Sequence, residues 1–119
     1  MSWTYVQSTG AMKFKNTIQG EGYSGYGVGR NNPALEWMHD VGPIPAGKWT
    51  IEKPAYNDPH LGPCVMKLTP VGHDAHGRTD FRIHGDNQTG DASHGCIIMA
   101  HGVREVISHS DDNELMVTA

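Results

Sequence analysis

Residues 42–52 read GPIPAGKWTIE, and this stretch indicates most directly which kind of fold the chain adopts. Its first six residues predict two successive turns, because proline fixes φ and glycine accepts backbone conformations that other residues avoid. Residues 48–52 then read as a strand. A chain that turns tightly and enters a short strand is typical of a β-rich domain rather than of a helical bundle.

The same pattern recurs along the sequence. Side chains alternate over residues 3–7, residues 8–10 supply a turn, and residues 12–15 can return as the second strand of a hairpin. Within residues 79–84, Phe81 and Ile83 are expected to face the core and Arg82 to face outward. The remaining predicted strands are residues 64–68 and the segment around Leu115 and Val117.

One short amphipathic helix is predicted after Cys96. Following residues 97–99, Val103, Val106 and Ile107 have the spacing i, i+3, i+4, and the helix is expected to end within residues 108–112. Residues 16–33 are rich in glycine and predict an extended surface loop. With 15 Gly and 7 Pro in 119 residues, turns are frequent. We therefore predict a mainly β fold in one compact domain, residues 1–119.

Composition excludes some classes of partner. Nine Lys and Arg against 13 Asp and Glu give a net charge of −4, without a dense basic run, so binding to nucleic acid is not expected. There is no apolar span long enough for membrane insertion, and the N-terminal residues lack the basic and apolar regions of a signal peptide. We thus expect synthesis in the cytoplasm. Two cysteines are too few for a disulfide scaffold, and Cys64 is expected to be a buried free thiol.

Reactive residue types concentrate in residues 81–97. A thiol attacks a carbonyl as thiolate, and an imidazole within reach removes its proton and later returns it to the leaving amine. We therefore expect Cys96 to be the nucleophile and His84 its base. Gly85 and Gly95 are expected to let the backbone bend beside these residues, leaving backbone N–H groups near the sulfur for an oxyanion.

The sequence His84-Gly85, followed by Ser93-His94-Gly95-Cys96-Ile97, resembles the active-site signature of L,D-transpeptidases of the YkuD type. Two features depart from that pattern. Only eight residues separate His84 from Ser93, and Ile98 stands where that family usually has arginine. These departures favour a shorter relative, the L,D-transpeptidase effectors of type VI secretion, which the chain resembles over nearly its whole length. The other matching pieces are Trp3-x-Tyr5-x-Gln7-Ser8-Thr9-Gly10, Gly22-Tyr23-Ser24-Gly25, Asn32-Pro33, residues 42–47, and Gly77-Arg78-Thr79.

This resemblance implies a compact L,D-transpeptidase-like β-sandwich or barrel without a cofactor. Its cysteine attacks the bond between the L-centre of the third stem residue and the terminal D-Ala of peptidoglycan tetrapeptides. Transfer to an amine gives transpeptidation or D-amino-acid exchange, and transfer to water gives L,D-carboxypeptidation. The resemblance also implies a toxin that acts in the periplasm of a target bacterium after secretion, with the secretion machinery and a cognate immunity protein as partners.

Further residues are candidates for shaping the site. His94 precedes the Gly-Cys pair and is expected to orient the substrate more than to act as a second base. Arg78 and Arg82 are candidates for holding a substrate carboxylate, against the alternative of solvated strand residues. The remaining candidates for substrate binding are Tyr23, Asp86, Asn87 and Ser93, of which Asp86 and Asn87 could equally cap a turn.

Two other functions remain open from the sequence. Eight histidines allow a zinc hydrolase in which His73 and His76 act with His60, His84 or Cys96, although a His-x-x-His pair in a loop has no fixed geometry. We expect no metal at the active site. A non-catalytic module that binds peptidoglycan is the other alternative, and thiol reactivity of Cys96 distinguishes it from an enzyme.

Overall fold

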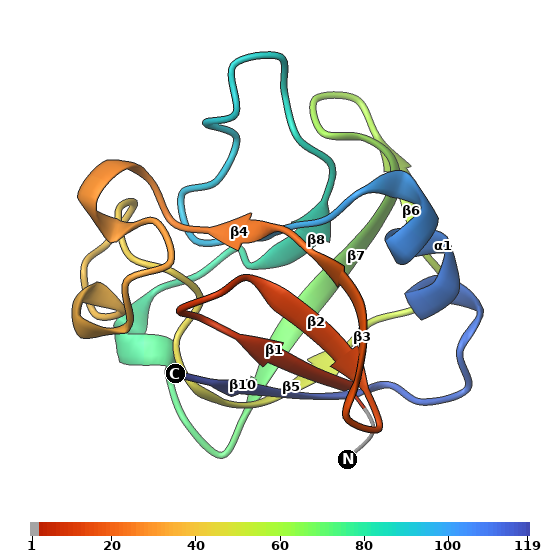
Figure 1. Cartoon of the computed structure of the whole chain (residues 1–119), viewed down its shortest axis with the longest axis horizontal. Coiled ribbons are helices and arrows are strands. Elements are labelled where there is room, and N and C mark those ends of the chain that lie inside the picture. The colour runs from red at the N-terminus through yellow and green to blue at the C-terminus, as the bar shows by residue number, and fades with distance from the viewer. Residues whose placement is uncertain (1–2) are drawn as a thin grey trace.

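The computed structural model describes residues 3–119, which contain ten short strands and one α-helix (Figure 1). Nine strands follow one another across a sheet in the order β3-β2-β1-β10-β5-β7-β8-β9-β4, and β6 pairs with β7. The prediction of a mainly β fold with one helix is confirmed. The predicted domain of residues 1–119 includes Met1 and Ser2, which lie outside the described residues.

The N-terminal hairpin forms as predicted. β1 (Trp3–Val6) pairs antiparallel with β2 (Ala11–Phe14), which continues into β3 (Thr17–Glu21). Along β1 the side chains of Trp3 and Tyr5 are buried, because alternate residues of a strand point to the same face. The C-terminal strand β10 (Glu114–Thr118) lies parallel to β1, so both ends of the chain contribute to one part of the sheet.

The double turn at residues 42–46 leads into β5 (Gly47–Ile51), which lies between β10 and β7. β7 (Gly62–Val71) is twice as long as predicted and also pairs with β6 (Tyr56–Asp58) and β8 (Arg82–His84). The prediction of a strand over residues 79–84 was too long at its start. Asp80 has φ +66°, a left-handed conformation that does not continue an extended strand.

The interpretation of residues 16–33 as a loop was wrong. This segment contains β3, the short strand β4 (Tyr23–Ser24) and a 3-10 turn, Gly27–Gly29, and a second 3-10 turn, Pro33–Leu35, begins at its last residue. β4 pairs with β9 (Ile97–Ile98) at the far end of the sheet. The strands were missed because glycine is normally unfavourable inside a strand and supplies no alternating side chain. Here the glycines allow close approach to neighbouring backbone.

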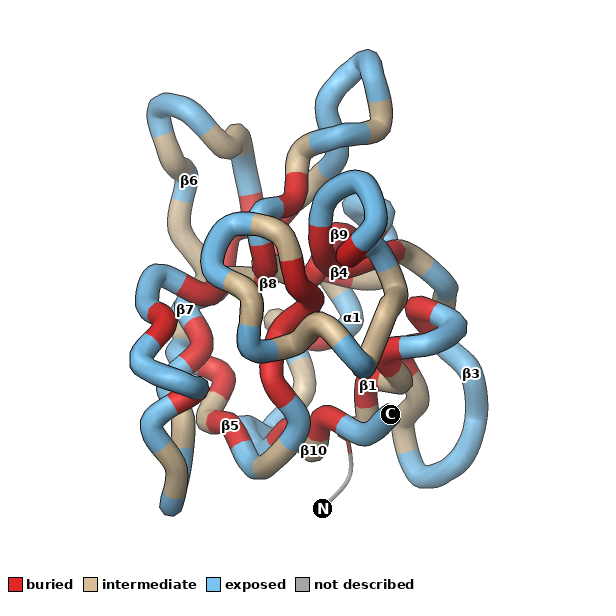
Figure 2. The backbone as a smooth tube through the Cα atoms, turned by 90° about the vertical axis from the view of Figure 1, so that its left-hand side faces the viewer, coloured by how far each residue is buried: buried red, intermediate tan, exposed pale blue. Residues whose placement is uncertain are grey.

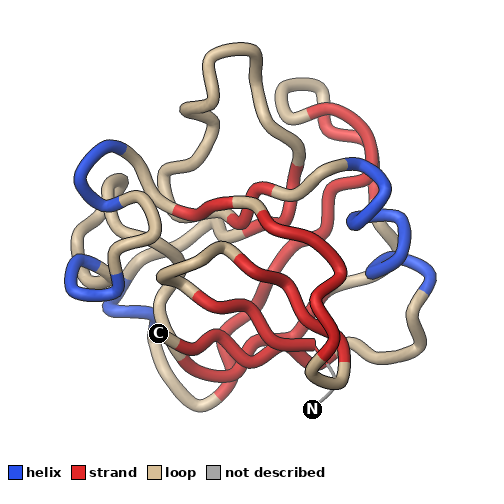
Figure 3. Tube along the Cα trace, in the orientation of Figure 1, coloured by secondary structure: helices blue, strands red, loops and turns tan. Residues whose placement is uncertain are grey.

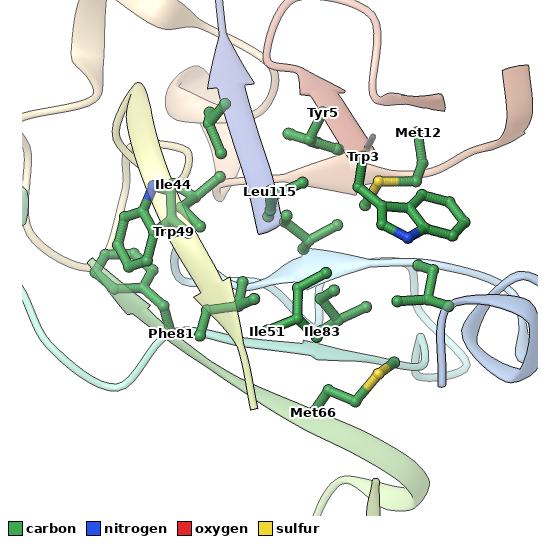
Figure 4. Packing of buried hydrophobic residues seen from close by; sticks show 14 of the residues in the cluster. Trp3, Tyr5, Met12, Ile44, Trp49, Ile51, Met66, Phe81, Ile83 and Leu115 are labelled. Carbon is green, nitrogen blue, oxygen red and sulfur yellow. The ribbon is translucent and has the colours of Figure 1, made fainter. Parts of the chain in front are cut away.

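Gly22 connects the two ends of the strand order, since it joins β3 directly to β4. Its N–H donates to the carbonyl of Gly10 at 2.8 Å. A Cβ at this position would lie 1.6 Å from the carbonyl oxygen of Ile98, so only glycine allows this approach. The sheet therefore curls around a single core, in which Trp3, Trp49, Met66, Ile83 and Leu115 point toward one another (Figure 4).

Helix α1 (His101–His109) follows β9 and ends at the predicted place. Ile97 and Ile98, directly before the helix, form β9. Buried residues line the inside of the strands, while loop tips are exposed (Figure 2). Within the described residues no helix is long and apolar enough to cross a membrane.

Candidate active site

The parallel pair β8–β9 positions both predicted catalytic residues. Ile83 is paired with Ile97, and His84 with Ile98, so Cys96, directly before β9, falls opposite Arg82. Ile83 and Ile97 are fully buried in the core. Because side chains alternate along a strand, Arg82, His84 and Cys96 project from the other face of this ladder. The residues between them form a loop that extends from the body of the protein (Figure 3).

The imidazole of His84 is held in one orientation by its own turn. Its Nδ1–H donates to the carbonyl oxygen of Gly85 at 2.8 Å, and this acceptor can only accept. In the neutral ring Nδ1 therefore carries the proton, and Nε2 is the basic nitrogen. Burial lowers the pKa of His84, and the positive charges of Arg104 and Arg82 lower it further. The ring is thus a neutral base at neutral pH.

The thiol of Cys96 is partly buried, and burial is the main cause that raises its pKa. The backbone N–H of Arg82 donates to the sulfur, and the charges of Arg82 and Arg78 also favour the thiolate. In the resting state the thiol donates to the carbonyl oxygen of Asp80 at 3.5 Å. The sulfur therefore begins as a protonated thiol, with donors and positive charges already placed for its anion.

Over residues 3–119 no hydrogen bond joins Cys96 to His84. The two side chains share a face of the β8–β9 ladder, but they are diagonal rather than direct neighbours in its register. Catalytic hydrogen bonds are often long or misaligned before substrate binds. The structure thus brings the two predicted residues to one face without joining them.

A pocket of about 200 Å³ opens beside the sulfur of Cys96. Its walls come from the segment before β8, from the Ser-His-Gly-Cys turn and from the end of the long connection between β4 and β5. Its lining residues are His39, Asp40, Arg78, Thr79, Asp80, Phe81, His94, Gly95 and Cys96. A larger hollow of about 990 Å³ lies between α1 and the β1–β2 hairpin and contains neither Cys96 nor His84. We place the candidate site at the smaller pocket, because it contains the reactive group.

Arg78 holds the wall of this pocket together. Its guanidinium donates to four backbone carbonyl oxygens, at distances of 2.5 to 3.2 Å. These acceptors belong to Glu36, Gly42, Pro43 and His94. The side chain is 6% exposed. All four N–H groups at the end of the side chain have acceptors within the protein, which leaves only Nε–H for another partner.

Ser93, His94 and Gly95 shape the turn before the nucleophile. The hydroxyl of Ser93 donates to the carbonyl oxygen of Cys96 and accepts from the N–H groups of Gly25 and Gly95. Ser93 is fully buried, so the structure places it beneath the site. The N–H of Gly95 is thereby used within the turn, contrary to our expectation that it would be left for an oxyanion.

His94 lies at the rim of the pocket. Its Nδ1–H donates to the carbonyl oxygen of Asp40 at 3.1 Å, and its ring stacks on Tyr26 with centroids 5.2 Å apart. These contacts connect the Ser-His-Gly-Cys turn to the segment between β4 and β5.

Tyr23, Asp86 and Asn87 lie away from the pocket of Cys96. The hydroxyl of Tyr23 donates to Asp86 at 2.5 Å and accepts from the N–H of Ala92. Burial, followed by the bond to Asp86, raises the pKa of Tyr23 to about 12. Tyr23 and Asp86 line a separate hollow of about 430 Å³, and Asn87 donates to Asp91 within the loop.

Gly85 is required for a different reason from the one expected. A Cβ on Gly85 would lie 2.7 Å from Nη2 of Arg104, so the missing side chain makes room for a buried guanidinium rather than for a bend. Sequence reasoning missed Arg104, because an arginine in an amphipathic helix usually faces solvent. It also missed His39, Asp40 and the carbonyl of Asp80, whose positions depend on long-range packing.

The zinc ligands considered from the sequence do not converge. Nε2 of His73 contacts the carbonyl oxygen of Lys48 at 2.9 Å, whereas Nε2 of His76 contacts Glu36 at 2.7 Å. These two imidazoles have separate partners. Their arrangement does not fit a shared metal centre.

Comparison with known families shows where the chain belongs. A family model described as the Tlde1 domain matches residues 18–118. This chain belongs to the Tlde1 family. The matched range includes both His84 and Cys96, and this is the type VI secretion L,D-transpeptidase effector family that the sequence resembled. A comparison with curated proteins gave no match. Tlde1 membership points to a peptidoglycan-modifying effector with L,D-transpeptidase-like activity.

Proposed function

We propose that this Tlde1 protein is a cysteine peptidyltransferase that cleaves the bond between the third stem residue and the terminal D-Ala of peptidoglycan tetrapeptides. The observation that carries the proposal is the bond from Nδ1–H of His84 to the carbonyl of Gly85. This bond leaves Nε2 as a neutral base on the ladder face that also carries the thiol of Cys96. A thiol and an oriented imidazole on one face are the minimum for thiol acylation.

The first step is attack on the carbonyl carbon of the third stem residue. Rotation about Cα–Cβ of Cys96 releases the thiol from Asp80 and turns it toward Nε2 of His84, which accepts its proton. A carbon–sulfur bond forms, and the carbonyl oxygen becomes an oxyanion. When the intermediate collapses, the peptide C–N bond breaks, and the imidazolium of His84 returns the proton to the leaving amine of D-Ala.

The second step releases the thioester. An incoming amine or water attacks the same carbon, gives one proton to Nε2 of His84, and expels the sulfur, which recovers the proton as a thiol. A D-amino acid or a second stem gives exchange or a crosslink, and water gives the tripeptide. The pocket beside Cys96 carries Asp40 and Asp80, which attract the ammonium form of an acceptor; it loses one proton to solvent before the neutral amine attacks.

Arg82 is positioned to help hold the donor stem. It lies on the same ladder face as Cys96, its side chain is partly exposed, and its Nε–H donates to the hydroxyl of Tyr56 at 3.1 Å. Of its two terminal nitrogens, Nη1 makes one weak contact of 3.4 Å with the carbonyl oxygen of Asp80, and neither has another hydrogen-bond partner within residues 3–119. We assign recognition of the D-Ala carboxylate to Arg82 rather than to Arg78, whose terminal donors are engaged.

Mass spectrometry of defined muropeptides tests the reaction. Purified protein incubated with tetrapeptide should give tripeptide, and an added D-amino acid should give the exchanged tetrapeptide. The Cys96→Ser variant should lose at least about 1,000-fold in rate, because an alcohol beside imidazole is a much poorer nucleophile here. It should also show no acyl-enzyme mass, while keeping the wild-type circular dichroism spectrum. Turnover by Cys96→Ser at the wild-type rate would refute the assignment.

As an antibacterial effector, the protein would act in the periplasm of a target cell, where tetrapeptide stems are exposed. Its peptidoglycan substrate, secretion machinery and cognate immunity protein belong to this proposal, which family membership supports. No residue of the described chain is assigned to the contacts with secretion machinery or immunity protein.

A further inference from the structure

Three potential metal ligands meet where α1 packs beside the start of β7. They are Cys64 near the start of β7, and His101 and Glu105 one helical turn apart in α1. Sγ of Cys64, a ring nitrogen of His101 and a carboxylate oxygen of Glu105 all lie within 4.8 Å of one another. Figure 1 shows α1 beside the upper end of β7, against which it packs. Within residues 3–119 this is the one group of three such side chains that is close enough to share an ion.

The contacts within this cluster already point the donor atoms inward. Nε2 of His101 lies 3.0 Å from Oε1 of Glu105, and the thiol of Cys64 donates to the same carboxylate. Helical spacing i, i+4 places His101 and Glu105 on one face, a more rigid arrangement than a pair of ligands in a loop. A tetrahedral zinc ion holds its ligand atoms about 3.5 Å apart, so small rotations of side chains suffice.

A buried arginine holds the backbone of Cys64 from the interior of the protein. Arg104 donates to the carbonyl oxygens of Pro63 and Cys64, at 2.5 and 3.3 Å. Cys64 itself is 8% exposed, whereas the side chains of His101 and Glu105 are about half exposed. The cluster is therefore anchored on its inner side and open to water on its outer side. An ion can enter from solvent and keep a water molecule as fourth ligand.

We propose that Cys64, His101 and Glu105 form a binding site for a divalent transition metal of the zinc type. One thiolate, one imidazole and one carboxylate suit Zn²⁺ and Co²⁺ better than Mg²⁺ or Ca²⁺, which prefer oxygen ligands. Binding releases the thiol proton of Cys64 to solvent, and Nε2 of His101 coordinates while the ring proton resides on Nδ1. The bound ion joins α1 to β7.

This site is distinct from the catalytic pair and has a structural role. Its three ligands are absent from the pocket beside Cys96. Its nearest connection to the catalytic base is Arg104, whose guanidinium packs against Gly85, the residue after His84. A metal that fixes α1 therefore stabilises the turn that orients His84, without taking part in the transfer of the acyl group.

Cobalt spectroscopy in the Cys96→Ser protein tests the site. The chain has two cysteines, so in this variant Cys64 is the one remaining thiol and any cobalt–thiolate absorption reports on it. We expect a near-ultraviolet charge-transfer band with visible bands of tetrahedral Co²⁺, all displaced by Zn²⁺. Adding His101→Asn or Glu105→Gln should weaken binding at least about tenfold, a loss that even outer-shell changes produce. His76→Asn changes a similarly exposed histidine whose partner is Glu36, outside the cluster, and it should leave binding unchanged.

A thermal measurement complements the spectra. Zn²⁺ should raise the melting temperature of the Cys96→Ser protein, because a ligand that binds only the folded state stabilises it. His101→Asn should abolish this rise, and its exposed position means that the variant can still fold. The proposal is overturned if no cobalt–thiolate band forms. It is equally overturned if His101→Asn and Glu105→Gln bind Co²⁺ as tightly as His76→Asn.

Discussion

At the scale of single residues, the catalytic pair combines an unusually basic thiol with an unusually weakly basic imidazole. Burial raises the pKa of Cys96 and lowers that of His84. The resting pair is therefore a neutral thiol and a neutral imidazole rather than a thiolate–imidazolium pair. Such a site transfers the proton during attack, so its rate depends on a neutral His84.

This electrostatic state predicts the pH dependence of turnover. A protonated His84 cannot accept the proton of the thiol, so kcat/KM falls as pH drops through the pKa of His84. Because that pKa is lowered from the ordinary histidine value of about 6.5, activity at pH 6.5 should exceed half of its plateau. A profile of kcat/KM from pH 4.5 to about 8 measures this midpoint. An acid limb centred above pH 7 would contradict the assigned state of His84.

The reactive residues were predictable because their chemistry is local in sequence, whereas their partners were not. His84 and the Ser-His-Gly-Cys turn lie within 13 residues, so a short motif carries them. Asp40 and Arg104 reach the site through the connection between β4 and β5 and through α1, which packs beside β7. No spacing of residues in the sequence predicts that these side chains lie close to Cys96 and His84.

At the scale of elements, Arg78 connects the segment before β8 to the connection between β4 and β5. Replacing it by methionine removes four charge-assisted hydrogen bonds and leaves buried carbonyl oxygens without a donor. Arg78→Met should lower the free energy of unfolding by about 3 kcal/mol, because each unsatisfied buried acceptor costs about 1–3 kcal/mol and relaxation recovers part of the loss. Urea denaturation measures this change.

Arg82→Met is the matched control, since Arg82 is partly exposed and donates mainly to one side chain. It should change stability by less than about 1 kcal/mol and raise KM. If Arg78→Met instead raised KM at unchanged stability, Arg78 would be the residue that holds the substrate carboxylate.

Gly95 sets the conformation of the turn before β9. It has φ +133°, and a Cβ there would lie 2.5 Å from Nη2 of Arg78 and 2.9 Å from the ring of Phe81. Gly95→Ala should therefore destabilise the protein by about 1–3 kcal/mol and reduce kcat/KM, because Cys96 shifts with the turn. In contrast, Gly102→Ala in α1 meets no atom within 4 Å and should be neutral or stabilising. Equal effects in the two variants would contradict this account.

The elements themselves were predicted where side chains alternate and missed where glycine dominates. The alternation of Trp3 and Tyr5 predicts β1, and the apolar spacing around Val106 predicts α1. β4 consists of two residues and exists only because β9 lies beside it. Gly22 lets the chain pass close to the backbone of Ile98 because it has no side chain. A search for patterns of hydrophobic residues cannot predict such a contact.

At the scale of the whole molecule, the proposed function predicts that injury depends on compartment. Tetrapeptide stems of the mature wall lie in the periplasm of a Gram-negative cell, and a folded protein of 13.0 kDa does not cross the inner membrane unaided. Expression of residues 1–119 in the cytoplasm should therefore be tolerated. Fusion to an added signal sequence should cause swelling or loss of shape before lysis, since removal or exchange of D-Ala depletes donors for crosslinking.

Growth curves, microscopy and muropeptide profiles of the same cells measure this effect together. The Cys96→Ser protein directed to the periplasm is the control that separates chemistry from binding, and it should leave growth and the tetrapeptide fraction unchanged. Periplasmic wild type should lower the tetrapeptide fraction or replace its terminal D-Ala before growth stops, because the chemical change causes the injury. Equal injury by wild type and Cys96→Ser would indicate a binding toxin instead. Equal killing from the cytoplasm would point to a substrate other than the mature wall.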